Sequence, residues 1–227
     1  MTSPFTLKLA VCLFDDVTSL DYSGPVELLS FIAPKAVATA DFGVKRNIPV
    51  IVPPTFLNYT RDPVKPMSGP DVLVNKAYDD VGPDEQFDII LVPGGLGSRP
   101  DRVQPSLIRF LQRQAPGAKY VLSVCTGSWI LAQAGLLDGK RATTNKASFK
   151  RTKEATAQQK IEWVPKARWV IDGKTWTASG VTAGIDMASA FLDELVGQDI
   201  AQDIRGIVEV SARDQGDDEF ADFYGLL

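Results

Sequence analysis

Three short apolar runs, each followed directly by a turn, constrain the fold of this chain more than any other feature. They are Leu7 to Phe14, Asp88 to Val92 and Tyr120 to Val124. A run that is apolar at nearly every position is typical of a parallel strand with both faces buried. Helical patterns alternate with these runs, and that order favours a doubly wound sheet with helices on both faces. We therefore expect an α/β fold of the flavodoxin-like, three-layer type with a mostly parallel sheet.

The remaining elements follow from weaker patterns. We expect helices over residues 23–31, 106–115, 126–137, 182–195 and 199–210, a short strand over 141–144, a hairpin over 169–177, and a strand or hairpin edge over 42–52. The first helix is expected to begin at Ser23 or Gly24, with Pro25 in its first turn. Pro53 to Pro70 is expected to be extended or looped.

Composition bounds the class of protein. The chain is predicted to be one domain over residues 1–227, with a core of about 7–211 and an acidic tail of about 212–227. With 24 basic and 28 acidic residues, its net charge of -4 gives no positive surface for nucleic acid or an anionic membrane. The N-terminus lacks the pattern of a signal peptide, and no segment approaches the roughly 18 apolar residues of a membrane span. We therefore expect a soluble, cytoplasmic protein that acts on a small molecule.

Cys125 is the candidate nucleophile, in the run Ser123-Val-Cys-Thr-Gly-Ser128. It follows a buried strand and opens a helix, which is the arrangement of a nucleophile elbow. The helix N-terminus is expected to favour the thiolate, and the small residues Gly127 and Ser128 to let substrate approach closely. Cys12, in the middle of a strand, is expected to be buried and inert. The two cysteines form no Cys-x-x-Cys pair or disulfide framework.

The absence of histidine from all 227 residues restricts the chemistry. A Cys–His dyad or triad cannot be assembled, and a zinc or iron site is disfavoured, so we expect no metal and no cofactor. Asp21 lies just beyond the first strand and is the candidate acid, with Glu27 as its rival. A carboxyl group held against the thiol in a dry pocket would have a raised pKa and serve as a proton donor. Asp15 and Asp16 are expected to be turn residues.

Backbone donors near the elbow complete the candidate site. Gly94 and Gly95 end the second strand, where bare N–H groups would stabilise a developing negative charge. Thr126 offers an N–H and a hydroxyl for the same purpose. The Gly94-Gly-Leu-Gly97 run has the wrong spacing for a P-loop or a dinucleotide-binding turn.

Together these motifs resemble the ThiJ/PfpI superfamily, which has the class I glutamine amidotransferase-like fold. The matching segments are Asp88 to Gly95, Val124 to Ser128, Ala132 to Thr144 and Ser179 to Asp186. The chain is most similar to the isocyanide hydratase branch, which carries an acid where Leu20-Asp-Tyr-Ser-Gly-Pro25 stands here. The resemblance implies Cys125 as nucleophile, Asp21 as general acid/base, Thr126 as an orienting or donor residue, and a homodimer.

Three departures separate the chain from other branches of the superfamily. Thr126 follows the cysteine, whereas the PfpI-type proteases have histidine there. Asn145 follows Ala142-Thr-Thr144, whereas many relatives have histidine, so a glyoxalase or deglycase activity is put in doubt. Lys146 replaces a commoner aromatic residue, a change that bears on substrate preference.

Three functions remain open from the sequence. The first is hydration of an isocyanide to the N-formamide, a carbon–nitrogen or carbon–oxygen lyase type of reaction. The second is a cysteine-dependent lyase, hydratase or tailoring reaction on another small electrophile, such as a reactive carbonyl. The third is a non-enzymatic redox sensor or stress holdase that uses oxidation of Cys125. The sequence does not name the natural substrate.

Overall fold

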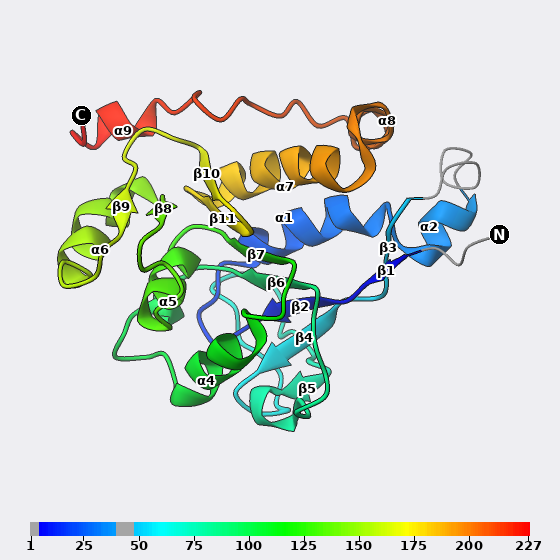
Figure 1. The fold of residues 1–227 in the computed structure, drawn as a ribbon, viewed down its shortest axis with the longest axis horizontal. Helices are drawn as coiled ribbons and strands as arrows, with labels where there is room; N and C mark the ends of the chain where they lie inside the picture. The colour runs from blue at the N-terminus through cyan, green and yellow to red at the C-terminus, as the bar shows by residue number, and fades with distance from the viewer. Residues whose placement is uncertain (1–4, 40–47) are drawn as a thin grey trace.

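A central sheet of seven strands organises the molecule, which we describe from a computed structural model over residues 5–39 and 48–227 (Figure 1). Its strand order is β10-β11-β7-β6-β2-β4-β5. The strands are β2 (Leu9–Cys12), β4 (Thr55–Asn58), β5 (Lys76–Ala77), β6 (Ile89–Val92), β7 (Tyr120–Ser123), β10 (Trp169–Asp172) and β11 (Thr175–Ala178). All neighbours pair in parallel except β10 and β11, which form an antiparallel hairpin. The expected mostly parallel sheet is confirmed.

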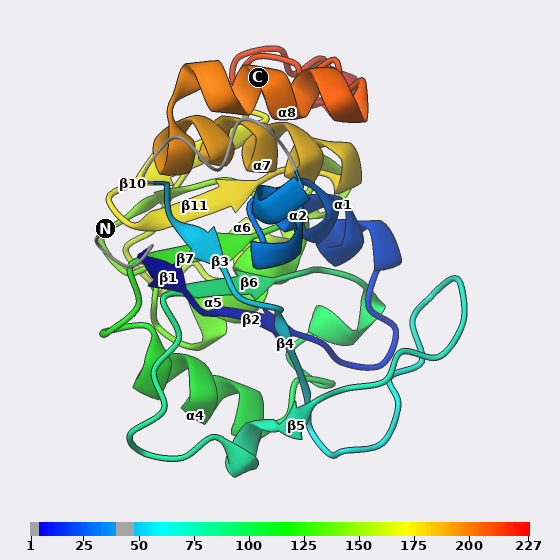
Figure 2. The ribbon, with the colours of Figure 1, turned by 90° about the vertical axis from the view of Figure 1, so that its right-hand side faces the viewer.

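Helices cover both faces of this sheet. On one face α1 (Ser19–Ser30) and α7 (Val181–Val196) lie side by side, and α8 (Gln198–Val208) packs outside α7 (Figures 1 and 2). On the other face lie α4 (Pro105–Gln114) and α5 (Gly127–Gln133). The strands in the middle are buried on both faces: every residue of β2 and of β6 is buried. This is the three-layer α/β architecture expected from the alternation of strands and helices.

Smaller elements surround the sandwich. They are β1 (Thr6–Leu7) paired with β3 (Val50–Ile51), β8 (Arg141–Ala142) paired with β9 (Glu162–Trp163), the helices α2 (Pro34–Thr39), α6 (Phe149–Ala155) and α9 (Phe220–Phe223), and the 3-10 turns η1 (Tyr78–Asp80), η2 (Leu96–Ser98) and η3 (Lys146–Ser148). The expected strand over 141–144 is therefore real but short, and it lies outside the central sheet.

The first helix begins earlier than the sequence suggested. The segment Leu20 to Pro25 is not a turn, because α1 starts at Ser19 and continues through Pro25. The helix tolerates this proline by giving up one backbone hydrogen bond. At Gly24 the helix α1 packs closely against α7. A Cβ at this position would lie 2.8 Å from Cγ1 of Ile185 on α7, so a residue with a side chain would not fit without a shift. Asp21 consequently sits in the first turn of a helix that is pressed against α7.

Three other sequence expectations need correction or restriction. The proline-rich stretch 53–70 contains β4, an interior strand of the sheet between β2 and β5, and is not looped throughout. The first apolar run is divided into β1 and β2 at Lys8, whose N–H donates to the Asp88 carboxylate at 2.9 Å. Of the expected strand or edge over 42–52, residues 42–47 lie outside the described residues, and β3 covers Val50–Ile51.

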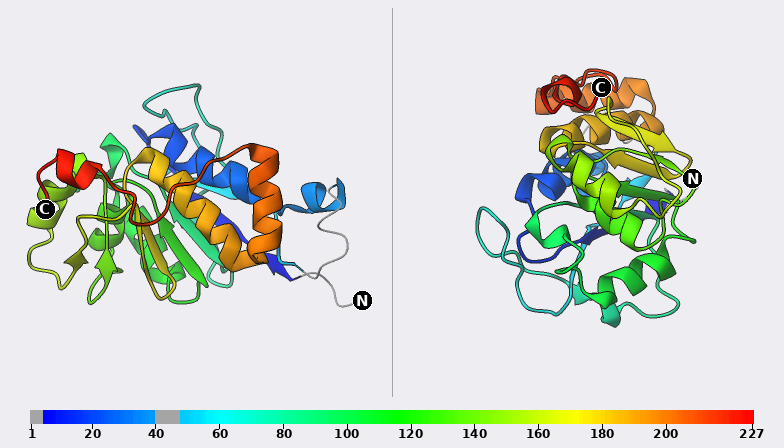
Figure 3. Two further views of the ribbon diagram at one scale, coloured as in Figure 1. Left: turned by 90° about the horizontal axis from the view of Figure 1, so that it is seen from above. Right: turned by 90° about the vertical axis from the view of Figure 1, so that its left-hand side faces the viewer.

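The C-terminal segment is part of the folded structure. It runs from α8 across α7 to α9, beside α6 (Figure 3). Asp218 is buried and its Oδ2 lies 3.1 Å from Nζ of Lys146, with exposed side-chain fractions of 1% and 2%. Lys146 Nζ also donates to Thr143 Oγ1 at 2.7 Å and to the Ala167 carbonyl at 2.9 Å. The buried ion pair between Lys146 and Asp218 therefore holds the C-terminal segment against the rest of the fold. The sequence had assigned no structure to this segment.

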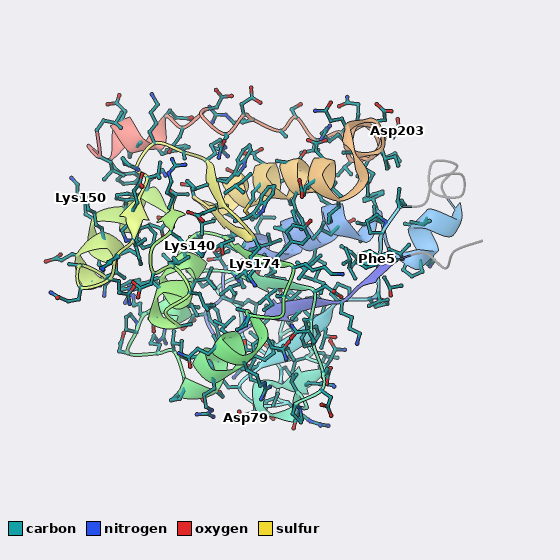
Figure 4. All side chains as sticks on the ribbon, in the orientation of Figure 1. Phe5, Asp79, Lys140, Lys150, Lys174 and Asp203 are labelled. Atoms are coloured by element: carbon teal, nitrogen blue, oxygen red, sulfur yellow. The ribbon has the colours of Figure 1, made fainter. Side chains whose placement is uncertain are left out.

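The charged side chains of Asp79, Lys150 and Asp203 project outward at the periphery (Figure 4). Within residues 5–39 and 48–227, no helix combines the length and the apolar character needed to cross a bilayer.

Candidate active site

The candidate site lies at the topological switch point of the sheet, beside β2. From β2 the chain adds β4 and β5 on one side, and β6, β7 and β11 on the other. The carboxyl ends of β2, β6 and β7 therefore meet at one edge, as expected for a ligand site in an open α/β sheet. The loop after β2 leads into α1 and Asp21, β6 is followed by Gly94 and Gly95, and β7 by Cys125.

Cys125 occupies a sharp turn between β7 and α5. Its φ of 58° is unusual for a residue other than glycine. The surrounding hydrogen bonds hold this conformation: its N–H donates to the Ala178 carbonyl at 3.2 Å. Its carbonyl accepts from Ser128 Oγ at 3.2 Å and from Thr144 Oγ1 at 3.1 Å. The expected nucleophile elbow is present, and the neighbouring strands fix it.

Glycines allow the elbow to approach the end of β6. A Cβ on Gly94 would lie 2.5 Å from the Thr126 nitrogen and 2.9 Å from Cys125 Cβ. A Cβ on Gly127 would collide with the Val92 carbonyl oxygen. Any side chain at either position would push the two strand ends apart, which explains why glycine stands at both.

Asp21 reaches the elbow from the first turn of α1 and is fully buried. Its Oδ2 accepts a hydrogen bond from the N–H of Gly94 at 2.9 Å. Its Oδ1 has no nitrogen or oxygen partner among the described residues. The Asp21 carboxyl group and the Cys125 thiol are close enough that each affects the pKa of the other. Burial raises the pKa of Asp21 from 3.8 to about 7, against the opposing effects of the Gly94 N–H and the thiol.

The thiol itself is held in its protonated form. Burial, followed by the charge of Asp21, raises the pKa of Cys125 to about 12, although the N–H and hydroxyl of Thr126 lower it. The N–H of Thr126 at the start of α5 lowers the thiol pKa, in the direction expected of a helix N-terminus, but it does not decide the net shift. Desolvation and the neighbouring carboxylate outweigh the donors at the start of α5. The pair therefore consists of a protonated thiol beside a carboxyl group whose pKa is raised toward neutrality.

Thr126 is held by the loop that follows β6. Its Oγ1 accepts hydrogen bonds from the N–H of Gly95 at 3.0 Å and from the hydroxyl of Ser98 at 2.8 Å. The Thr126 hydroxyl itself donates to the Gly95 carbonyl at 3.3 Å, and the N–H and hydroxyl of Thr126 lower the pKa of the Cys125 thiol. Ser98 is a site residue that the sequence did not indicate, since a serine in a glycine-rich turn carries no special pattern.

Four of the expected donor or substrate-contact residues have other roles. The N–H groups of Gly94 and Gly95 are not bare, because they donate to Asp21 and Thr126 and so orient the acid and the threonine. Gly127 and Ser128 are buried behind the elbow: the Gly127 N–H donates to the Val124 carbonyl at 2.9 Å, and Ser128 Oγ donates to the carbonyl of Cys125. Close packing explains the small residues better than substrate access does.

The rival residues lie away from the thiol. Glu27 is exposed on α1 and faces a different hollow, between α1, α7 and α8. Asp15 accepts from the Lys65 N–H at 2.9 Å, and Asp16, with a φ of 59°, pairs with Arg102, so both are turn residues as expected. Cys12 is fully buried in β2, and burial raises its pKa well above the usual range.

A pocket of about 330 Å³ opens above Cys125. Its walls come from several elements and combine apolar and cationic side chains: Thr18, Met67, Gly95, Leu96, Ser98, Arg99, Thr126, Trp129, Asn145, Ser148, Arg151 and Val181. This volume suits a small organic substrate. Asn145, where many relatives have histidine, lines the pocket with its Oδ1 accepting from the Ser148 N–H at 3.2 Å. Within the described part of the chain, no three Cys, Asp or Glu side chains are grouped to hold a metal ion.

The fold and the site define an α/β protein with a cysteine on a nucleophile elbow and a buried acid beside it. The chain belongs to the DJ-1/PfpI family, whose family model matches residues 7–194. The resemblance seen in the sequence motifs is thereby confirmed.

Characterised relatives and solved structures agree with this assignment. The chain is 36% identical over 197 residues to an isonitrile hydratase of Pseudomonas putida, covering 86% of this chain and 75% of the relative. It is 30% identical over 128 residues to a deglycase of Pyrococcus horikoshii, covering 56% and 73% of the two chains. Among solved structures, a ThiJ/PfpI family protein from Pseudomonas syringae superposes with a TM-score of 0.67 at 23% identity, over 94% of this chain and 79% of the other.

Proposed function

We propose that this protein hydrates an isocyanide to the corresponding N-formamide. The observation that carries the proposal is the placement of the Cys125 thiol and the buried Asp21 carboxyl group around Gly94, where each affects the pKa of the other and burial raises that of Asp21 to about 7. Such a pair can move one proton back and forth without histidine, which the chain lacks. The isonitrile hydratase relative, 36% identical over most of both chains, supports the same reaction.

The first half of the reaction forms a covalent adduct. The Asp21 carboxylate takes the thiol proton as Cys125 sulfur attacks the terminal carbon of R–N≡C. The same carboxyl group then delivers that proton to the carbon, and the product is a thioimidate, R–N=CH–S–Cys125. No proton has to enter from solvent in this half, which suits a buried carboxyl group.

The second half adds water and releases the thiol. Asp21, again a carboxylate, accepts a proton from the attacking water and passes it to the imine nitrogen. The tetrahedral intermediate R–NH–CH(OH)–S–Cys125 collapses to the formamide R–NH–CHO, and the leaving sulfur recovers its proton. The sum is one water added to one isocyanide. Thr126, whose hydroxyl and N–H lower the pKa of the Cys125 thiol, stabilises negative charge on the sulfur in both halves.

Formamide production from cyclohexyl isocyanide tests the proposal. Wild type should turn over, Cys125→Ala should lose all turnover, and Asp21→Asn should lose about 10²- to 10⁴-fold in kcat. Glu27→Gln is the matched control, because this acid is exposed on the same helix and does not face the sulfur. Turnover that survives Cys125→Ala, or a near-normal rate in Asp21→Asn, would exclude the mechanism.

A reactive carbonyl is the second candidate substrate, since a deglycase is among the relatives. Asn145 stands on the pocket wall where relatives of that type have histidine, so the chain lacks a base at this position. Incubation with methylglyoxal decides between the two: lactate formed by wild type and lost in Cys125→Ala would favour the carbonyl reaction over the isocyanide reaction.

We further propose that the protein works as a homodimer in a reducing, cytoplasmic environment without a cofactor. Both cysteines are free and buried in the structure, in keeping with a reducing compartment. Sedimentation equilibrium should give twice the chain mass of 24.7 kDa. A monomer at micromolar concentration would contradict the proposed assembly.

A further inference from the structure

Two arginines on the wall of the active-site pocket have no acidic partner. Arg99 follows η2, Arg151 lies on α6, and both line the pocket above Cys125. No ion pair joins either side chain to a carboxylate of the described residues. The other arginines that the structure describes make an ion pair or donate to a backbone carbonyl: they are Arg61, Arg102, Arg109, Arg113, Arg141, Arg168, Arg205 and Arg213.

The pocket lining is one-sided in charge. It contains two guanidinium groups and no carboxylate, although acidic residues outnumber basic ones in the chain as a whole. Asn145 adds amide N–H donors, since its Oδ1 is already occupied by the Ser148 N–H. Arg99 is half-buried, which shields its charge from water more than at an open surface. The wall therefore presents donors and positive charge to whatever occupies the pocket.

These charges do not serve the thiol. The pKa of Cys125 is raised by burial and by Asp21 and lowered by the two donors of Thr126. Arg151 is positioned instead by the pocket wall, with its guanidinium carbon 5.4 Å from the centre of the Trp129 ring. The arginines are thus available to a ligand.

We propose that the substrate carries a carboxylate, which Arg99 and Arg151 bind, and we infer an isocyano carboxylate as the substrate class; this inference rests on the proposed function. A guanidinium group offers paired N–H donors that match a carboxylate. Met67, Leu96 and Val181 supply the apolar part of the same wall for the carbon skeleton. The isocyano carbon then reaches the Cys125 sulfur while the acid group stays among the arginines. The pocket of about 330 Å³ has room for such a compact molecule.

Isocyanoacetate and its methyl ester test this inference, because they share the reacting group and differ in charge. Wild type should have the higher kcat/KM for the acid. Arg99→Gln should lower kcat/KM for the acid by about tenfold and leave the ester nearly unchanged. Arg151→Gln should act in the same direction. Arg102→Gln is the matched control, because Arg102 lies three residues from Arg99, pairs with Asp16 and is absent from the pocket wall.

A binding measurement separates this inference from the proposed function. N-formylglycine, the hydration product of isocyanoacetate, should bind the Cys125→Ala protein more tightly than its methyl ester in calorimetry, and Arg99→Gln should remove the difference. If both isocyanides are hydrated equally well, or if Arg99→Gln affects acid and ester alike, the carboxylate site is wrong and the hydratase stands. If neither isocyanide is hydrated, the proposed function fails together with the isocyano substrate class. Equal affinities for N-formylglycine and its methyl ester would overturn the proposed carboxylate site whatever the result of the activity assays.

Discussion

Asp21 and Cys125 form a proton-sharing pair whose two members are both more basic than free side chains. The reason is the same for both: burial removes water from the charged form. In the proposed reaction, chemistry begins with proton transfer from the thiol to the carboxylate, without a thiolate already present. The ionised carboxylate of Asp21 is the form that can accept the thiol proton, so the protonation of this one group governs the reaction.

The pH dependence of turnover follows from that requirement. Below pH 7 Asp21 is protonated and cannot accept the thiol proton, so kcat/KM should rise with pH with an apparent pKa near 7. No falling limb is expected below pH 9, since the thiol pKa is about 12. A pH–rate profile for a neutral isocyanide measures this directly. A profile that declines between pH 6 and 8 would contradict the assignment of Asp21 as the base.

Stability should show the opposite trend. The folded-state pKa of Asp21 is raised from 3.8, so the folded protein binds this proton more tightly than the unfolded chain, and the associated stabilisation is lost as pH rises from about 4 to about 7. In Asp21→Asn the buried group cannot ionise, so the variant does not lose this stabilisation as the pH rises. At pH 8 the variant should be more stable than wild type by up to about 4 kcal/mol, with the gain shrinking toward pH 4. Urea denaturation at both pH values measures it, and equal gains at pH 4 and pH 8 would count against the raised pKa.

Single residues of the site divide into those with a sequence signal and those without one. Cys125 and Asp21 were predicted because a thiol at a strand–helix junction and an acid after a neighbouring strand share one edge of a parallel sheet. Ser98, Arg99 and Arg151 were missed because their roles depend on which loops meet above the elbow. The raised thiol pKa was missed too, because burial is a property of the packed structure.

At the scale of elements, the contact between the end of β6 and the start of α5 determines the geometry of the site. Gly94→Ala would place a Cβ 2.5 Å from the Thr126 nitrogen, so the elbow or the β6 turn must move. We expect a loss of about 1–3 kcal/mol in stability and a larger loss in kcat than in substrate binding. Gly82→Ala is the control, because nothing lies within 4 Å of its added Cβ. Near-normal activity in Gly94→Ala would show that the contact is not needed.

The sequence predicted elements well where hydrophobic periodicity was strong. The helices now seen as α4, α7 and α8 and the hairpin β10–β11 lie within a few residues of the expected ranges. The predictions from the sequence were wrong at two places where proline was taken as a sign of a turn or loop. Pro25 lies inside α1, and two prolines directly precede the interior strand β4. In both places tertiary packing outweighs the local preference, against α7 in one case and between β2 and β5 in the other.

At the scale of the whole molecule, the C-terminal segment joins distant parts through Lys146 and Asp218. Asp218→Asn removes the counter-charge of a buried ammonium group, and we expect a loss of about 3–5 kcal/mol in the free energy of unfolding. Glu219→Gln is the matched control, because the neighbouring pair with Arg213 is exposed and should contribute little. Chemical denaturation of both variants gives the comparison, and equal stabilities would mean that the buried pair does not fasten the segment.

The protonated resting state of Cys125 also limits unwanted reactions. Peroxide and disulfides react with thiolates, and a sulfur with a pKa of about 12 offers almost none at neutral pH. In the proposed reaction the thiolate forms only as Asp21 takes the thiol proton. We therefore expect the resting sulfur to react with peroxide more slowly than an exposed cysteine thiol, whose pKa is lower.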